Sequence, residues 1–375
     1  MWQQNQPELW ENDMNNIPYL LALHSIDGLG PIRLKALIEY FKDPKLAWEA
    51  DLKQIREIGI PQSTVELLVE TRKKLDPEKY AQSISNSGIK WLTIFDEEYP
   101  KLLKEIYDPP IVLYYKGEIL PKDDKAIAIV GTRKMTGYGK AVTEQFTQGL
   151  VDGGLTIVSG LARGVDSLAH QTVLKEDGRT IAVLGGGLNY IFPPENTELA
   201  NKISQGFGAI ISEFPPNYPS LAGNFPARNR IISGLSLAVL VTEAAEDSGS
   251  LITARLALEQ GREVFAVPGP ITSTLSKGPI DLIKEGAKVV TDPQEILDDL
   301  GISQGVRVKV KGESELELSD DEKKILDYLE NETRHIDEVC RSLNLSAAQV
   351  SASLVKMEIK GIVRNLGNGI YTEAS

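Results

Sequence analysis

The sequence is poor in the residues that hold metals and disulfides. Among its 375 residues are one cysteine, Cys340, and three histidines, His24, His170 and His335. A single thiol cannot form an internal disulfide, and so few nitrogen and sulfur ligands argue against a zinc cluster or cysteine–histidine catalysis. We therefore expect neither a metal nor a cofactor.

Long apolar runs and a leader are also missing. No stretch of about 18 uninterrupted apolar residues occurs, so no membrane-spanning helix is expected. The first eight residues carry no lysine or arginine, which argues against a secretory signal. These two features predict a cytoplasmic protein.

Positive charge is in the minority. Lysine and arginine number 40 against 53 aspartates and glutamates, a formal net charge of −13. This balance argues against wholesale coating of a polyanion, so any nucleic-acid site must be a local basic patch. At roughly 150 residues per domain, the length predicts two to three domains.

Residues 17–71 repeat apolar side chains at intervals of three and four, which is typical of amphipathic helices. Glycine, proline and aspartate interrupt the repeat at 27–31, 42–44 and 58–61, where helices should end. The pattern predicts a small helical domain over residues 1–85.

From residue 88 to about 300, short apolar runs alternate with helical stretches. Continuous apolar runs are typical of parallel strands that are covered on both faces. The alternation predicts a doubly wound, mostly parallel α/β sheet over residues 86–300. Strands are expected at 126–130, 155–159, 180–184, 209–212, 237–242, 264–267 and 287–290.

The last part of the chain has a third pattern. Residues 301–317, of mixed charge and rich in glycine, serine and lysine, predict a linker. Residues 318–375 predict three helices and a hairpin that turns at Gly367-Asn368-Gly369. The helices are expected at 321–330, 336–343 and 346–359, with Ser346 as the N-cap of the third, which is the outline of a winged helix.

The ends of the predicted strands carry groups suited to phosphate. In an open parallel sheet, ligands bind beyond the carboxyl ends of the strands. Glycines that admit close backbone approach follow the first three runs, and the segments after the first, second and fourth runs carry four arginines, Arg133, Arg163, Arg228 and Arg230. Guanidinium groups and helix N-termini bind phosphate, so the sequence predicts a phosphate-binding cleft.

Each loop also admits a purely structural interpretation. The glycines can form ordinary turns, and Ser248 can serve only as a helix N-cap. Asp166 is expected to cap the helix that it begins. His170, four residues later, is interpreted as a buried, hydrogen-bonded side chain rather than a catalytic acid or base.

The Arg-Asn-Arg motif at 228–230 is the most informative local feature. We expect a helix to begin there, and cations at a helix N-terminus are unfavourable unless an anion neutralises them. A bound phosphate would supply that anion. An ion pair with Glu213 or Glu243 is the alternative.

Six motifs follow one another in order across the central domain. They are Gly-Thr-Arg at 131–133, Ser-Gly-Leu-Ala-Arg-Gly-Val-Asp at 159–166, Thr-Ile-Ala-Val-Leu-Gly at 180–185, Phe-Pro-Ala-Arg-Asn-Arg at 225–230, Ser-Gly-Ser-Leu-Ile-Thr-Ala-Arg at 248–255 and Ala-Val-Pro-Gly at 266–269. This ordered set resembles the DprA/Smf family of DNA-processing proteins. The resemblance implies a Rossmann-like core without catalytic residues. It also implies a homodimer through the central domain that binds single-stranded DNA, protects it and loads RecA recombinase during natural transformation.

The resemblance also suggests which residues bind the strand. Arg133 is expected to be a principal contact, with Arg163 and the two arginines of the Arg-Asn-Arg motif as its neighbours, and bases are expected to stack on Tyr138 or Phe225. The chain departs from some relatives at Asn189 and at Pro194. The predicted DNA-binding residues are Gly131, Thr132, Arg133, Lys134, Ser159, Gly160, Arg163, Gly164, Gly185, Gly187, Asn189, Phe225, Arg228, Asn229, Arg230, Ser248, Gly249, Ser250 and Thr253.

The flanking domains resemble accessory modules of the same family. Residues 26–33 resemble the turn of a helix-hairpin-helix or SAM-like domain, whose amides can touch phosphate, or they form a plain helix corner. The winged helix has ten acidic and seven basic residues over 318–375. Because duplex binding needs more positive charge, we expect a protein-contacting or regulatory role for it.

Two other functions stay open. A nucleotide phosphoribohydrolase of related fold would use Glu213 or Glu243 near a ribose, with Thr253 in the pocket. An adaptor that binds only proteins is the second alternative, and the Arg-Asn-Arg motif argues against it.

Overall fold

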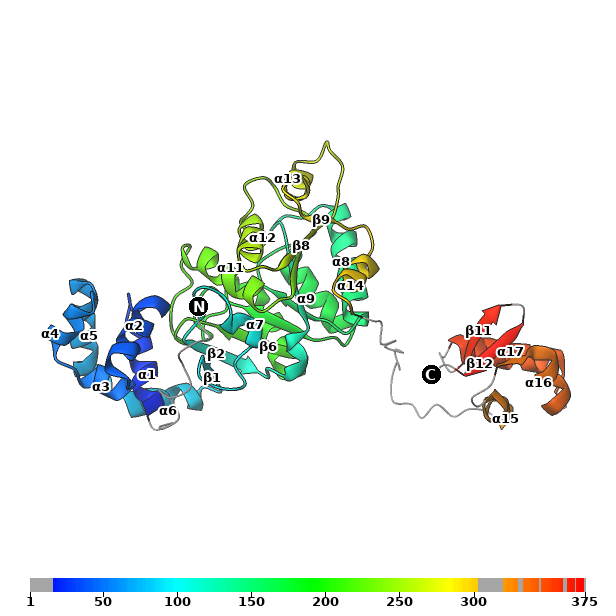
Figure 1. Ribbon diagram of the computed structural model, residues 1–375, viewed down its shortest axis with the longest axis horizontal. Helices are drawn as coiled ribbons and strands as arrows, with labels where there is room; N and C mark the ends of the chain where they lie inside the picture. Colours follow the sequence, from blue (N-terminus) through cyan, green and yellow to red (C-terminus); the bar gives the residue numbers. More distant parts are fainter. Residues whose placement is uncertain are drawn as a thin grey trace. The chain divides into compact units, whose positions relative to one another are not determined.

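The structure is a computed structural model that describes residues 16–302, 320–329, 333–343, 345–359, 363–367 and 369–373 (Figure 1). The chain divides into two compact units, Met1–Gly305 and Val306–Ser375. From residue 303 onward the predicted linker lies outside the described residues. Within the described ranges, no helix has the length and apolar character needed to cross a bilayer.

Six helices open the described part of the chain, as the apolar repeat predicts. The breaks between them fall where proline, glycine and aspartate were expected; at one break, the Asp43 carboxylate accepts hydrogen bonds from the amides of Lys45 and Leu46 at 2.6 and 3.0 Å. Such a cap replaces the missing intrahelical acceptor. The helices are α1 (Ile17–His24), α2 (Pro31–Phe41), α3 (Pro44–Glu49), α4 (Leu52–Glu57), α5 (Gln62–Lys74) and α6 (Pro77–Asn86).

A nine-stranded sheet follows, in the order β1-β2-β6-β5-β4-β3-β7-β8-β9. The seven strands from β6 to β9 are mutually parallel, which confirms the predicted doubly wound α/β class. These strands are β3 (Ala126–Val130), β4 (Thr156–Ser159), β5 (Thr180–Val183), β6 (Gly208–Ser212), β7 (Ala238–Val241), β8 (Glu263–Ala266) and β9 (Lys288–Val289).

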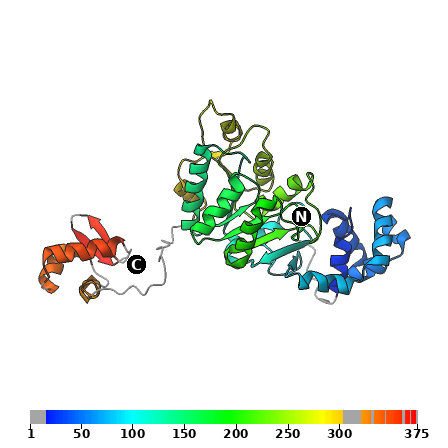
Figure 2. The ribbon, with the colours of Figure 1, turned by 180° about the vertical axis from the view of Figure 1, so that it is seen from behind.

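Alternate side chains of β3 enter two different apolar cores. Ile127 and Ile129 belong to a cluster with residues of α8, α9 and α14, whereas Ala128 belongs to a cluster with residues of α11 and α12. Both faces are therefore covered, as a continuous apolar strand requires. Figures 1 and 2 show helices on both sides of the sheet. These helices are α8 (Gly137–Asp152), α9 (Val165–Lys175), α11 (Asn224–Gly234), α12 (Gly249–Glu259) and α14 (Pro293–Asp299).

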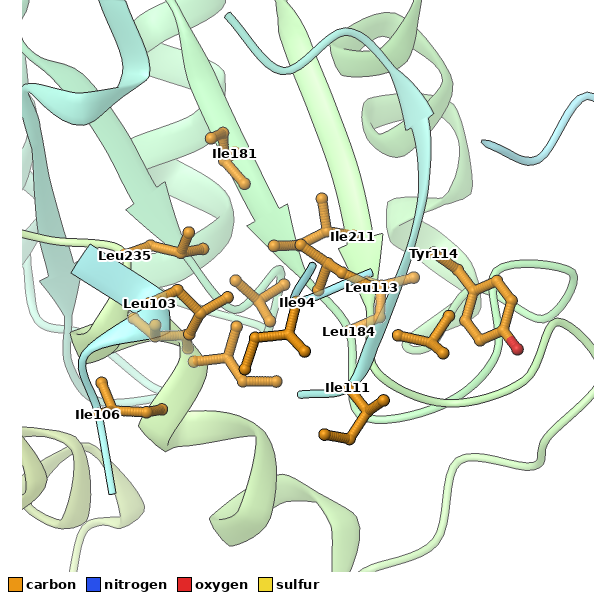
Figure 3. Packing of buried hydrophobic residues seen from close by; sticks show 14 of the residues in the cluster. Ile94, Leu103, Ile106, Ile111, Leu113, Tyr114, Ile181, Leu184, Ile211 and Leu235 are labelled. Atoms are coloured by element: carbon orange, nitrogen blue, oxygen red, sulfur yellow. The ribbon is translucent and has the colours of Figure 1, made fainter. Parts of the chain in front are cut away.

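The antiparallel edge of the sheet was not predicted. β1 (Lys90–Thr93) pairs with β2 (Val112–Gly117), and β2 pairs with β6, both in antiparallel register. The segment between β1 and β2, which includes α7 (Lys101–Lys104), buries apolar side chains against the sheet and α11. Figure 3 shows this packing, with Leu103, Ile106, Ile211 and Leu235 among the labelled side chains.

The N-terminal helices contact the sheet region through two polar links. His24 Nδ1 lies 3.1 Å from the hydroxyl of Tyr114 on β2, and burial lowers the pKa of His24 to about 4. The Tyr218 hydroxyl donates to the Asp27 carboxylate at 2.8 Å. The helical region and the sheet thus form parts of one compact unit.

The C-terminal unit has the predicted winged-helix elements. Ser346 caps the third helix as expected: its hydroxyl accepts from the Gln349 amide at 3.3 Å, and the Gln349 side chain accepts from the Ser346 amide at 3.1 Å. This reciprocal pair is a capping box. The Asn368 position of the predicted turn lies outside the described residues. The elements are α15 (Asp320–Leu329), β10 (Arg334–His335), α16 (Ile336–Leu343), α17 (Ala347–Ile359), β11 (Val363–Gly367) and β12 (Ile370–Glu373).

Candidate nucleic-acid interface

The candidate site lies where the strand order reverses. From β3 the chain moves through β4, β5 and β6 on one side of the sheet, then returns to the other side of β3 for β7, β8 and β9. The carboxyl ends of parallel strands at such a point are the usual place for ligands. The loops after β3, β4, β5 and β7 carry most of the predicted residues.

The loop that holds Arg133 is fixed by backbone contacts. The Thr132 amide donates to the Glu243 carbonyl at 2.6 Å, and the Val165 amide donates to the Thr132 carbonyl at 3.1 Å. Gly164 has φ +76°, and a Cβ there would lie 2.2 Å from the Thr132 carbonyl oxygen, so only glycine fits. Arg133 itself is exposed and, within the described ranges, has no carboxylate partner.

Glu243 has a structural role in this loop. Its buried carboxylate accepts from the Thr136 amide at 2.9 Å and from the Thr136 hydroxyl at 2.7 Å, at the N-terminus of α8. A negative charge at that end also complements the helix dipole. Glu243 therefore does not pair with the Arg-Asn-Arg motif, contrary to one of the two alternatives.

The expected helix start at the Arg-Asn-Arg motif is wrong. Helix α11 begins at Asn224, so Arg228 and Arg230 lie in its second turn. The dipole argument for a bound anion does not apply to this position. Both arginines are buried, with 4% and 7% of their surfaces exposed.

Arg228 holds two strand ends together. Its guanidinium donates to the Gly160 carbonyl, after β4, at 2.6 Å and to the Val183 carbonyl at the end of β5. A Cβ at Gly160 would lie 2.5 Å from Arg228 Nη1, so the glycine is needed for this approach. Burial lowers the pKa of Arg228 to about 10, which still leaves it a cation at neutral pH.

Arg230 makes internal ion pairs, the second alternative that the sequence left open. It donates to the Glu213 carboxylate at 2.6 and 3.1 Å and to Asp108 at 2.9 Å. Burial alone would lower the pKa of Arg230, but these two carboxylates outweigh burial and raise it. The side chain thus ties α11 to β6 and to the segment before β2.

Asp166 and His170 on α9 are buried. Asp166 accepts a hydrogen bond from the Gly160 amide at 3.1 Å and so stabilises the loop after β4. It does not cap helix α9 as expected, because the N-cap of this helix is Gly164. His170 Nδ1 lies 2.7 Å from the Thr180 hydroxyl, which itself donates to a backbone carbonyl, so Nδ1 carries the proton. Burial lowers the pKa of His170 to about 3, and the side chain is buried and hydrogen-bonded as the structural interpretation expected.

Arg163 is the one predicted arginine with an exposed ion pair. Its Nε donates to the Glu195 carboxylate, and both side chains are at least half exposed. Exposed pairs of this kind contribute little to stability. The guanidinium can therefore exchange its partner at low cost.

One aromatic ring lies beside the exposed Arg133, and a second ring packs against the first. The Arg133 Cζ atom lies 5.8 Å from the centroid of the Phe225 ring. The centroid of the Phe192 ring lies 5.8 Å from the centroid of the Phe225 ring. Phe192 was not among the predicted residues, although its position two residues after the Asn189-Tyr190 turn pointed to the same loop. The Tyr138 hydroxyl donates to the Pro268 carbonyl at 2.5 Å, which fixes that ring beside the β8 loop.

The start of α12 adds small polar groups. Ser248 caps the helix through the Ser250 amide at 3.4 Å, as the structural interpretation expected, and the Asn229 side chain donates to the Gly249 carbonyl at 3.2 Å. Ser250 and Thr253 are buried. This loop is thereby joined to α11.

The remaining predicted residues line the ends of β4 and β5. The buried Ser159 hydroxyl donates to the Ile129 carbonyl at 2.6 Å. The Gly187 amide donates to the Tyr218 carbonyl at 2.8 Å, and the exposed Asn189 side chain donates to Asn217 at 2.7 Å. In the part of the chain that the structure describes, no group of three or more histidine, cysteine or acidic side chains could hold a metal ion.

Comparison with known proteins shows the family of the chain. Residues 90–301 match the family model of DNA recombination-mediator protein A, and residues 310–369 match the DprA winged helix domain. The chain is 37% identical to Protein Smf of Synechocystis sp. over 381 residues, which cover 92% of this chain and 96% of that protein.

Two solved structures extend the likeness. DNA processing protein A of Streptococcus pneumoniae superposes with a TM-score of 0.67 at 37% identity, covering 75% of this chain and 97% of that one. DNA processing protein A of Helicobacter pylori, described for its single-stranded DNA binding mode, superposes with a TM-score of 0.51 at 32% identity. The superposition covers 56% of this chain and 95% of that one. The family model of DNA recombination-mediator protein A spans the whole nine-stranded sheet, from β1 to β9. The chain therefore belongs to the DprA/Smf family of DNA recombination-mediator proteins.

Proposed function

We propose that this protein binds single-stranded DNA at the carboxyl edge of its sheet and acts as a recombination mediator. The observation that carries the proposal is the state of Arg133. Its guanidinium is exposed, it has no carboxylate partner in the described ranges, and its loop is fixed by the Thr132 and Gly164 contacts. An unpaired cation on a rigid loop is ready to bind a phosphate without reorganisation.

Phosphate contacts come from the exposed cations. Arg133 and Lys134 are both exposed, and Arg163 joins them when a phosphate displaces Glu195. Three contacts on a single strand correspond to a salt dependence of about 0.7 logarithmic units each. In a protein of net charge −13, this small patch supports local binding and not the coating of DNA.

A base contact comes from Phe225. Its ring lies within 6 Å of the guanidinium carbons of both Arg133 and Arg228, at 5.8 and 5.9 Å. Base–aromatic stacking tolerates any sequence, because every base has a π-face. Binding should therefore show little sequence preference.

The other predicted residues form the frame. Arg228 and Arg230, with Asn229 between them, are buried and bonded to backbone carbonyls or carboxylates. We assign them the role of holding β4, β5, β6 and α12 in register beneath the exposed loops. The glycines of the strand ends make the same packing possible.

The resemblance supports a wider role. We propose that the bound strand is protected and passed to RecA recombinase, and that the protein acts as a homodimer in the cytoplasm. The winged helix would contact protein, since Lys356 is the only basic residue between Ala347 and Ile359.

The test is the affinity for a fluorescent oligothymidylate, measured by anisotropy over a series of salt concentrations. Arg133→Gln should bind about tenfold more weakly, because a charge-assisted hydrogen bond is lost. Its salt slope should fall by about 0.7. Arg56→Gln, an equal change of charge at an exposed site on α4, is the control and should match the wild type. Equal affinity and slope for both variants would contradict the proposed site.

A further inference from the structure

Phe192 is an exposed aromatic ring beside the candidate site. Some 44% of its surface is accessible, and its ring is tilted by 46° to that of Phe225. A single exposed apolar side chain is ordinary, but this one packs against Phe225, the aromatic ring that lies beside the unpaired Arg133.

The loop that carries Phe192 is anchored on both sides of it. Before the ring, the Asn189 amide donates to the Pro216 carbonyl at 3.0 Å. After it, Pro193 is buried, and the Asn196 side chain donates to the Leu161 carbonyl at 2.8 Å. The exposure of Phe192 is therefore a property of an ordered loop.

The Phe225 ring lies between Arg133 and Phe192 in a series of two contacts of equal length. The Arg133 Cζ atom is 5.8 Å from the Phe225 centroid, and the Phe225 centroid is 5.8 Å from that of Phe192. We propose that Phe192 is a second stacking platform, which takes the unpaired base next to the one on Phe225. The inference rests on the proposed function, since it presumes a strand whose phosphate is held by Arg133.

The chemistry selects unpaired bases. A phenyl ring offers a stacking face and no hydrogen bonds, so it accepts any base but needs that base out of a duplex. It carries no charge, and its contribution does not depend on salt. Loss of Phe192 should therefore change affinity and leave the salt slope alone, which is the reverse of a lost phosphate contact.

The first test compares variants on oligothymidylate. Phe192→Leu should bind about tenfold more weakly than the wild type, the size of one base–aromatic stack, with an unchanged salt slope. Tyr107→Leu, at a ring with 88% of its surface exposed between α7 and β2, is the control and should bind like the wild type.

The second test separates base from phosphate and does not depend on Phe192→Leu folding. Phe192→Trp should show tryptophan emission quenched by oligothymidylate but not by an abasic strand of equal length, and Tyr107→Trp should show no quenching by either. Undiminished affinity of Phe192→Leu, or equal quenching by both strands, would overturn the platform. If Arg133→Gln still binds more weakly in that case, the proposed function stands; if the wild type binds no oligonucleotide, the proposed function itself fails.

Discussion

Arg230 and Glu213 form a two-point ion pair inside the protein, with the guanidinium nitrogens 2.6 and 3.1 Å from the carboxylate oxygens. Asp108 accepts a third hydrogen bond from the same guanidinium at 2.9 Å. This arrangement joins α11 to the end of β6. Arg230, which the sequence predicted as a DNA-binding residue, thus stabilises the packing of α11 against the sheet.

Breaking this pair should destabilise the fold. Arg230→Ala leaves Glu213 buried without its partner, and removal of one member of a buried pair costs about 3–5 kcal/mol. Urea unfolding should report a loss of this size. Arg230→Met combined with Glu213→Leu, which removes both charges, should recover most of it. Equal losses in the single and double variants would contradict a role based on charge pairing.

Removing the partner of Arg163 should strengthen DNA binding. Glu195→Gln removes the partner that a phosphate must otherwise displace from Arg163, so affinity for a single strand should rise about threefold, while the salt slope should stay the same because the number of phosphate contacts does not change. Anisotropy titrations at several salt concentrations measure both quantities. Glu198→Gln removes the same charge from a pair with Lys202 on α10 (Thr197–Lys202) and is the control. A gain shared by both variants would mean only a general electrostatic effect.

Stability should fall as the pH is lowered below 6.5. Burial holds the pKa of His24 at about 4 and that of His170 at about 3, both below the unfolded value of 6.5. Between pH 6.5 and 5 the unfolded chain binds more protons than the folded one. Each histidine therefore removes about 1.4 kcal/mol of stability per pH unit.

Urea unfolding at several pH values tests this linkage. His24→Gln and His170→Gln should each reduce the pH slope by about one proton, whatever their effect on stability at pH 7. A slope that neither substitution changes would show that other groups cause it.

Nucleoside monophosphates should not be hydrolysed. Both carboxylates that a phosphoribohydrolase could use are already bonded, Glu213 to Arg230 and Glu243 to Thr136. Chromatography of an incubated mixture should detect no free base. Release of base that Glu213→Gln or Glu243→Gln abolishes would restore the enzyme alternative.

The winged helix should add little to DNA binding. The described chain forms two separate compact units, so a protein that ends at Gly305 should keep the single-strand affinity of the full chain within about twofold. A loss of tenfold or more, or nanomolar duplex binding that needs residues 306–375, would contradict a protein-contacting role.

Local patterns were sufficient for most of the fold. The period and length of the apolar runs predicted the parallel strands, the N-terminal helices and the winged helix, because side-chain periodicity follows directly from backbone geometry. The antiparallel strands β1 and β2 were missed. β1 has only two adjacent apolar residues, and β2 begins just after the prolines at 109 and 110, so the regular alternation of strand and helix does not extend to this segment.

Local patterns also indicated where to propose the site, because the carboxyl ends of parallel strands meet at one edge whatever the side chains are. Local patterns could not predict which arginines are exposed and which are buried with internal partners. Arg133 is exposed, Arg163 is paired at the surface, Arg228 bonds to carbonyls and Arg230 bonds to carboxylates. Only tertiary structure made this division, since the decisive partner of a cation can be as remote along the chain as Asp108 is from Arg230. A guanidinium pairs with whichever acceptor the fold brings within about 3 Å, and that distance is not written in its neighbours along the sequence.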